Sequence, residues 1–114
     1  MLKTNKINGD KGEILSSQYL TKKGYKILET NFKNKIGEID IIAFKNGCYV
    51  FIEVKKRETK LFGRPCEAVD YKKQQKIRKV ALSYLKFKKL LDVECRFDVI
   101  EILGDDINHI ENCF

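Results

Sequence analysis

Three residues whose side chains could do chemistry together, Asp40, Glu53 and Lys55, flank a short turn. The chain on either side of the turn, residues 37–44 and 48–55, is rich in β-branched and aromatic residues and predicts two strands. The Asn-Gly pair between them is a strong signal for a two-residue hairpin turn. We therefore expect an antiparallel hairpin whose register is fixed by its turn.

This register sets the two carboxylates against each other. It places Asp40 directly opposite Glu53, and Glu38 directly opposite Lys55, with all four side chains on one face because side chains alternate along a strand. Two carboxylates about 5 Å apart repel, so the pairing is destabilising unless a cation joins them. The arrangement predicts a divalent-metal site with a lysine beside it.

A solvated surface strand is the alternative, since 34% of the chain is charged. The apolar residues of the hairpin favour a partly buried site instead. The face of Asp40 also carries Ile42, Phe44, Tyr49 and Phe51, and the other face carries Ile39, Ile41, Ala43, Val50, Ile52 and Val54. A hairpin that is apolar on both faces is typical of layered α/β folds. Buried charges in such a fold are normally paired or bound to metal.

Composition indicates one globular domain, residues 1–114, with a net charge of +7. We expect a cytoplasmic protein without a membrane segment, because no apolar run is long enough to span a bilayer and the first residues do not resemble a secretion signal. The positive charge favours a polyanionic partner, although many basic proteins bind no nucleic acid. No oligomeric state is indicated.

The four cysteines, Cys48, Cys66, Cys95 and Cys113, form no zinc-binding spacing. Disulfides are unexpected in a cytoplasmic chain, so we interpret the cysteines as small, partly buried apolar residues. The single histidine, His109, receives no catalytic role.

Helical periodicity predicts helices over residues 11–23 and 69–88. Glu13 falls in the first turn of the first helix, where capping alone would explain it. The apolar stripe of the second helix, extended toward its start, reaches Lys73 and Gln74, which then point into a cavity. Solvent exposure is the alternative for the lysines of that helix. Further strands over 25–32, 96–102 and 109–114 give the order α-β-β-β-α-β plus a short terminal strand.

This order, with Asp40 preceding Glu53-Val54-Lys55, resembles the PD-(D/E)xK superfamily, and it is most similar to the YraN-like family of small bacterial proteins. The resemblance implies a restriction-endonuclease-like three-layer α/β fold, with a central mixed sheet flanked by helices. It covers nearly the whole chain through these stretches: Gly12-Glu13, residues 24–28, 37–42, 50–57, 62–65 and 67–69, and 96–100.

The resemblance also implies site roles. Asp40 and Glu53 would hold Mg²⁺ or Mn²⁺ with the Val54 carbonyl, and Lys55 would position or deprotonate the attacking water. Glu13 matches a helix glutamate that joins the site in junction-resolving relatives.

The leading hypothesis is therefore a Mg²⁺-dependent nuclease that hydrolyses phosphodiesters in DNA, including branched or otherwise non-standard DNA. A non-catalytic nucleic-acid-binding module is the alternative, and a scaffold protein is a third reading that leaves the charge asymmetry unexplained. The sequence does not choose DNA over RNA. The residues expected to contact nucleic acid are Lys56, Arg57, Arg64, Lys72, Lys73, Gln74 and Lys76.

Overall fold

The computed structural model describes residues 11–58, 66 and 69–114, in which the predicted order of elements is confirmed. Arg64 lies outside the described residues. The elements are α2 (Lys11–Lys22), β1 (Lys26–Lys33), β2 (Glu38–Lys45), β3 (Cys48–Arg57), α3 (Tyr71–Phe87), β4 (Glu94–Leu103) and β5 (Asp106–Ile110). The terminal strand thus begins and ends earlier than predicted.

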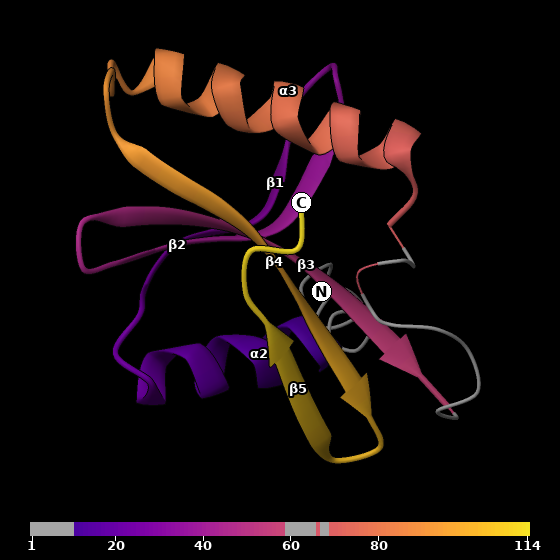
Figure 1. Ribbon diagram of the computed structural model, residues 1–114. Helices are drawn as coiled ribbons and strands as arrows, with labels where there is room; N and C mark the ends of the chain where they lie inside the picture. Colours follow the sequence, from indigo (N-terminus) through magenta and orange to yellow (C-terminus); the bar gives the residue numbers. More distant parts are fainter. Residues whose placement is uncertain (1–10, 59–65, 67–68) are drawn as a thin grey trace, which may run out of the picture.

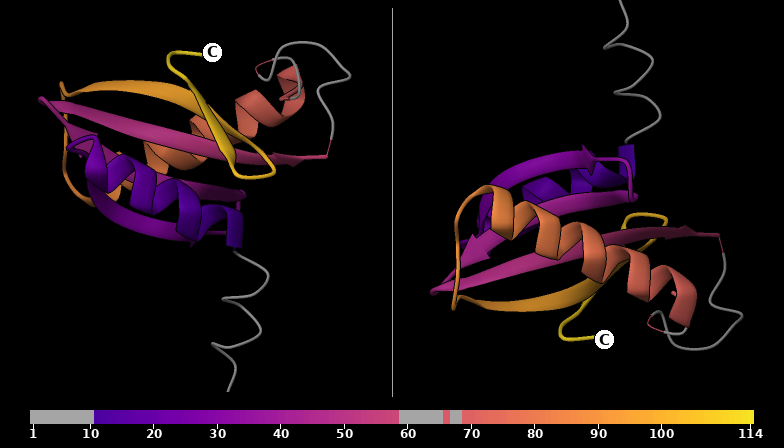
Figure 2. Two further views of the ribbon diagram at one scale, coloured as in Figure 1. Left: turned by 90° about the horizontal axis from the view of Figure 1, so that it is seen from below. Right: turned by 90° about the horizontal axis from the view of Figure 1, so that it is seen from above.

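The five strands form one mixed sheet in the order β1-β2-β3-β4-β5. All neighbouring pairs are antiparallel except β3 and β4, which run parallel because α3 carries the chain back across the sheet. Helix α3 covers one face and α2 the other, so the described chain is a three-layer α/β structure (Figures 1 and 2).

Each helix buries its own apolar cluster against the sheet. Below α3 the core contains Phe51 and Phe97 packed on Val80 and Tyr84, and below α2 it contains Leu20 packed among strand residues such as Ile52. The central strand β3 contributes to both clusters, because its alternate side chains point to opposite faces. The prediction of a hairpin covered on both sides is confirmed.

The turn between β2 and β3 has the predicted geometry. Asn46 and Gly47 have φ values of 52° and 80°, a conformation that suits glycine and asparagine. The register from Lys45↔Cys48 to Ile41↔Ile52 is the one predicted. It ends there, so in the described residues the register includes neither of the two expected pairs, Asp40 with Glu53 and Glu38 with Lys55. Glu38 pairs instead with Lys33 of β1.

The side-chain alternation of β2 also breaks at this point. Ile41 packs with Ala43, Val50 and Ile52 under α2, on the face predicted for it. Ile39, predicted on that same face, packs instead with Ile42 in the cluster under α3. The predicted position of Ile39 was therefore wrong. The physical reason is that β2 diverges from β3 beyond Ile41, where it is paired only with β1.

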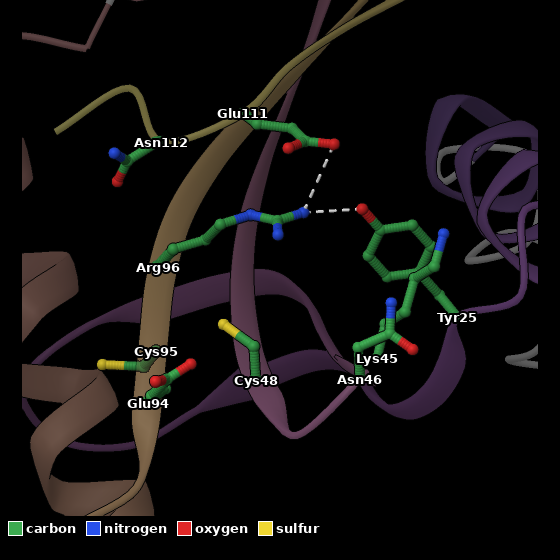
Figure 3. A pocket seen from close by; sticks show the side chains of 9 residues that line it. All are labelled: Tyr25, Lys45, Asn46, Cys48, Glu94, Cys95, Arg96, Glu111 and Asn112. Atoms are coloured by element: carbon green, nitrogen blue, oxygen red, sulfur yellow. Dashed lines mark hydrogen bonds and ion pairs between the residues drawn. The ribbon is translucent and has the colours of Figure 1, made fainter.

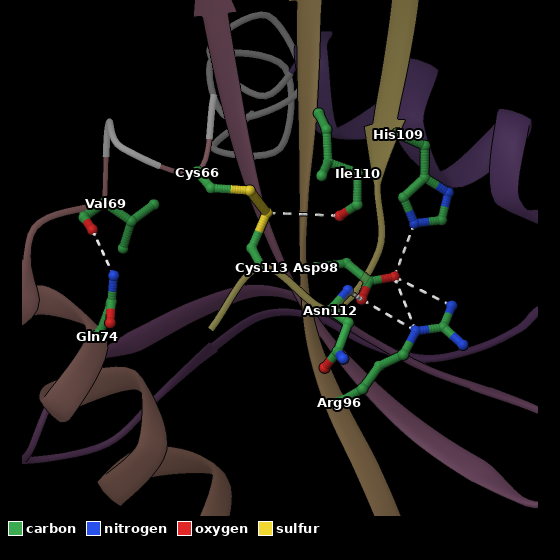
Figure 4. Close-up of a disulfide and its surroundings, with 9 residues drawn as sticks. All are labelled: Cys66, Val69, Gln74, Arg96, Asp98, His109, Ile110, Asn112 and Cys113. Carbon is green, nitrogen blue, oxygen red and sulfur yellow. Dashed lines mark hydrogen bonds and ion pairs between the residues drawn. A yellow bond between two sulfur atoms is a disulfide. The ribbon is translucent and has the colours of Figure 1, made fainter. Parts of the chain in front are cut away.

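The expectation of no disulfide was also wrong, because Cys66 is bonded to Cys113 (Figure 4). The chain after β5 turns back toward α3, with the Cys113 amide donating to the Phe97 carbonyl at 2.6 Å and Phe114 stacking on Phe97. This return places Cys113 beside Cys66, which lies in the connection between β3 and α3. A contact between cysteines 47 positions apart carries no local sequence signal.

A buried polar network centres on Asp98, which is fully buried (Figure 4). Arg96 Nε donates to Asp98 Oδ1 at 3.0 Å, His109 Nε2 lies 2.7 Å from Oδ2, and the Asn112 amide donates to Oδ1 at 2.9 Å. Burial raises the pKa of Asp98, but hydrogen bonds from His109 and Arg96 bring it below its ordinary value. The network joins β4 to β5 and to the segment that follows it.

Among the described residues, no helix is both long enough and apolar enough to cross a membrane.

Removing the disulfide should lower the free energy of unfolding. The bond closes a loop with a sequence separation of 47, for which chain entropy gives about 4 kcal/mol. Urea unfolding with and without dithiothreitol measures the effect. Cys48→Ser/Cys95→Ser should respond to reductant like the wild type, and Cys66→Ser/Cys113→Ser should not respond. A wild type indifferent to reductant would contradict the bond.

Asp98→Asn should destabilise the protein by about 3 kcal/mol at neutral pH, because it leaves Arg96 and His109 without the buried carboxylate they share. The pKa of Asp98 is depressed in the fold, so its contribution is present above about pH 4 and disappears as the pH falls further. Urea titrations across pH test this. Asp106→Asn, an exposed change on β5, should have almost no effect.

Candidate carboxylate–lysine site

The site lies where β2 and β3 separate. Asp40 is the first β2 residue beyond the end of their shared register, and its Oδ2 accepts a hydrogen bond from the Val54 backbone amide at 2.8 Å. A side chain thus satisfies an amide of β3 that faces the gap. This contact anchors the Asp40 carboxylate between the two diverging strands.

Glu53 lies next to Asp40 and is only 6% exposed. Its Oε2 is 2.6 Å from Lys73 Nζ, which reaches down from the first turn of α3, and 3.9 Å from Lys55 Nζ on its own strand. The carboxylates and Lys73 line a cleft of about 180 Å³, together with Gly37, Glu38, Lys76 and Ile77. The predicted inward direction of Lys73 is confirmed.

Glu13 approaches from the opposite layer. It lies in the first turn of α2, is half-buried, and forms a side-chain hydrogen bond with Asp40. Its neighbour Gly12 permits this approach, because a Cβ there would lie 3.0 Å from the Lys56 side chain of β3. Glu13 therefore faces the site, so its position at the helix N-terminus is not its whole role.

The crowding of carboxylates changes the protonation of Asp40. Burial raises its pKa, the charge of Glu53 raises it further, and Glu13 adds to the shift, while the Val54 amide opposes it; the resulting pKa is about 8. The cause is that an anion is poorly solvated in the gap and has another anion beside it. Asp40 therefore binds a proton in the absence of another cation.

The two lysines respond in opposite directions. Burial lowers the pKa of Lys55, and the nearby charge of Lys73 lowers it further. Burial also lowers the pKa of Lys73, but its hydrogen bond with Glu53 and the charge of Glu53 outweigh burial, so the net pKa is raised. Lys55 therefore releases its proton more readily than Lys73, and Lys73 remains protonated in its ion pair with Glu53.

The other expected contact residues are distributed differently. Lys76 lines the cleft and Lys72 is exposed on α3. Gln74 does not line the cleft, contrary to the expectation that it points into a cavity, and its Nε2 donates to the Val69 carbonyl at 2.8 Å (Figure 4). Arg57 pairs with Glu101 at 3.5 Å, which partly neutralises it, and the stem of Lys56 covers the start of α2.

In the described part of the chain, no three histidine, cysteine, aspartate or glutamate side chains gather so that they could hold a metal by themselves. The cleft does bring together the carboxylates of Asp40 and Glu53 at the point where β2 and β3 separate, and the ammonium groups of Lys55 and Lys73 lie near Glu53. Such a cluster can bind a cation through hard oxygen ligands, move a proton, or contact a phosphate.

A larger cavity of about 720 Å³ lies at the other end of β3, beside the hairpin turn (Figure 3). Arg96 points into it and contacts the Tyr25 hydroxyl at 2.6 Å and Glu111 at 3.6 Å. Its lining combines two cations with two carboxylates and contains none of the predicted site residues. We place the candidate chemistry in the smaller cleft, because Asp40, whose pKa is raised, lies there beside Glu53.

Sequence reasoning missed the hydrogen bond between Asp40 and Val54 and the divergence of the strands around it. No local signal marks these features, because Ile39, Asp40 and Ile41 keep the apolar–polar–apolar alternation of an ordinary strand. The network around Asp98 and His109 was also missed, since its members come from two strands and the final segment.

Fold and site together define a three-layer α/β protein with a cleft of carboxylates and lysines. The chain belongs to the uncharacterised protein family UPF0102, whose model matches residues 12–102. Membership of an uncharacterised bacterial family, predicted from the sequence, is thus confirmed.

Relatives match over nearly their whole length. A UPF0102 protein of Alkaliphilus metalliredigens is 48% identical over 109 residues, covering 93% of this chain and 96% of that protein. The UPF0102 protein of Caldanaerobacter subterraneus subsp. tengcongensis is 49% identical over 122 residues and covers 100% of both chains. That of Thermodesulfovibrio yellowstonii is 51% identical over 106 residues, covering 93% of this chain and 94% of that protein.

Asp40→Asn should stabilise the metal-free protein at pH 8 by at least about 1 kcal/mol, the upper range for a like-charge pair across strands, because the cost of burying the charge adds to the repulsion. The pKa of Asp40 is raised to about 8, so the unfolded chain loses this proton first and wild-type stability falls as the pH rises from about 4 to about 8. Asn keeps an oxygen for the Val54 amide but does not titrate.

Urea unfolding at several pH values measures this difference, with exposed Asp92→Asn as the control. If Asp40→Asn and wild type lose stability in parallel over that pH range, the carboxylate repulsion inferred for the cleft is absent.

Proposed function

We propose that this protein is a metal-dependent nuclease that hydrolyses phosphodiester bonds in DNA, using Mg²⁺ or Mn²⁺. The observation that carries the proposal is the proximity of the Asp40 and Glu53 carboxylates in a poorly solvated cleft, next to Lys55. Two adjacent carboxylates destabilise the folded state, so a purely structural role does not explain them. A reaction that depends on a bound cation would use both.

The architecture supports a restriction-endonuclease-like fold of the PD-(D/E)xK type. Its element order is that expected from the resemblance, and α2 and α3 flank a mixed sheet. The aspartate stands on β2 and the Glu-x-Lys on β3, at the ends where these two strands diverge. Glu13 reaches the same point from α2, as the resemblance implies.

The donor set fits Mg²⁺ chemically. Magnesium takes hard oxygen ligands, keeps several waters, and is usually held by one or two carboxylates plus substrate phosphates, so Asp40 and Glu53 suffice as its main protein ligands. Asp40 and Glu53 would hold the ion, with the Val54 carbonyl and Glu13 as further oxygen donors. When bound, the ion polarises the phosphodiester and lowers the pKa of a bound water.

The two lysines would have different tasks. Lys55, whose pKa is lowered, would orient the attacking water and accept its proton more readily than an ordinary lysine. Lys73, which neutralises Glu53 at 2.6 Å, would shift from the carboxylate to the substrate phosphate when a metal ion takes its place. Metal binding would thus replace the ammonium group of Lys73 beside Glu53 with the metal ion.

Helix α3 supports a polyanionic substrate. All its charged residues are basic, and its first turn holds two lysines and no acidic residue. Cations at a helix start are unfavourable against the helix dipole, so these lysines do not serve helix stability. They suit phosphate contacts, and the proposal takes DNA, including branched DNA, as the substrate.

A non-catalytic nucleic-acid-binding module is the second candidate. The contact of Lys73 with Glu53 favours it, because an internal ammonium group already neutralises one of the two carboxylates. In that case the lysines of α3 would bind phosphates, and the carboxylates would only fix the position of Lys73.

Melting temperatures with and without Mn²⁺ test the proposal, together with cleavage of linear, nicked, flapped and four-way DNA. Wild type should be stabilised by Mn²⁺, and Asp40→Asn should lose both this gain and cleavage, while still binding DNA without metal. Lys55→Ala should retain the metal-dependent gain and lose cleavage, because its role is on the water.

Two results would count against the nuclease. Wild type that gains no thermal stability from Mn²⁺ and cleaves none of the four substrates would remove its basis. DNA binding retained in that protein, and weakened by Lys73→Ala, would favour the binding module.

A further inference from the structure

A second hollow continues from the carboxylate–lysine cleft along α3. The cleft is bounded by Gly37 on one side and by Lys76 on the other. The next hollow, of about 360 Å³, is lined by Ile36, Lys79, Leu82, Ser83 and Lys86. Residues 36 and 37 are adjacent and Lys79 lies one helical turn after Lys76, so the linings of the two hollows follow each other along α3 and we treat the hollows together as one groove. We call this the α3 groove.

The lysine wall of the groove follows a single face of α3. Lys76, Lys79, Ser83 and Lys86 are spaced by three or four residues, which places them in a row along the helix. The row extends about 15 Å at 1.5 Å per residue. The second hollow has two lysines and no acidic residue in its lining.

The opposite wall is the connection between β1 and β2, and it is held in place. The Asn34 Oδ1 atom accepts hydrogen bonds from the backbone amides of Ile36 and Gly37 at 2.9 and 3.2 Å. The Asn34 amide also lies 3.4 Å from the Ser83 hydroxyl, which links this wall to α3. Exposed Lys33 and Lys35 flank the same connection and add positive charge.

Apolar side chains are exposed within this cationic setting. Ile36 is 41% exposed and Leu82 is 54% exposed, and both line the second hollow. A duplex presents mainly phosphates to a groove of this kind. A single strand presents phosphates to the lysines and unstacked bases to the apolar residues, which is the combination that sequence-independent single-strand binders use.

We infer that the α3 groove binds a single-stranded segment of nucleic acid that leads away from the carboxylate–lysine cleft. Lys79 and Lys86 contact its phosphates, and Ile36 and Leu82 contact its bases. The inference rests on the proposed nucleic-acid substrate and deepens it: the strand entering the cleft is unpaired on the α3 side, as in a flap or at a branch.

The test measures binding without metal, so that it is independent of cleavage. A fluorescent oligothymidylate and a blunt duplex of the same length are titrated over a range of salt concentrations. Lys79→Ala/Lys86→Ala is compared with Lys22→Ala/Lys26→Ala, which removes the same charge from exposed positions of α2 and β1. Leu82→Ser tests the base contact. Unchanged melting temperatures show that each variant is folded.

The groove variant should bind oligothymidylate more weakly, with a log-log salt slope smaller by about 1.4, since each neutralised single-strand phosphate contributes about 0.7. The matched control should retain the wild-type slope. Leu82→Ser should weaken oligothymidylate binding and leave duplex binding unchanged, because only the single strand presents bases to it.

Three results would overturn the inference: no binding of oligothymidylate by the wild type, equal losses in the two double variants, or a loss for Leu82→Ser that is the same on duplex. Wild type that binds oligothymidylate through Lys79 and Lys86 but cleaves nothing with Mn²⁺ would support the groove and contradict the nuclease. The two proposals therefore fail separately.

Discussion

The repulsion between the carboxylates of Asp40 and Glu53 is the constraint that determines which groups surround them in the site. Two carboxylates in a poorly solvated gap are stable only if hydrogen-bond donors or cations contact them, and the surrounding elements provide both. The Val54 amide donates to Asp40, and Lys73 and Lys55 approach Glu53. These partners do not offset the cost of an Asp40 anion here, since burial, and after it the charge of Glu53, still raise the pKa of Asp40 to about 8. A remaining need for positive charge is what makes the cleft a candidate cation site.

The fold produces this cluster by separating two strands that are paired at their other end. Near the turn, β2 and β3 keep a regular register, and beyond Ile41↔Ile52 they part. The gap admits the start of α2 with Glu13 and the start of α3 with Lys73, one from each layer. The three-layer architecture thus matters for function because both helices begin at the same end of the split.

The features that could be predicted from the sequence are those that depend on residues close together in the chain. Asn46-Gly47 determined the turn, and the turn determined which residues approach each other, so the neighbourhood of Asp40 and Glu53 followed from a few residues. Contacts between distant segments were not predictable in this way. The disulfide and the network of Asp98 depend on the final segment folding back over the sheet, and the position of Ile39 depends on where the strands part. Only three-dimensional packing specifies these features.

The central claim is that burial and the charge of Glu53 keep Asp40 protonated in the metal-free protein. Carboxyl ¹³C NMR titration of Asp40 with and without Mg²⁺ tests this directly. The account predicts an apparent pKa near 8 in the metal-free protein. Saturating Mg²⁺ should then lower the pKa by more than about 3 units, to its ordinary range or below, because the metal binds only the ionised form. An Asp40 pKa that Mg²⁺ leaves unchanged, or one that is ordinary from the start, would contradict the account.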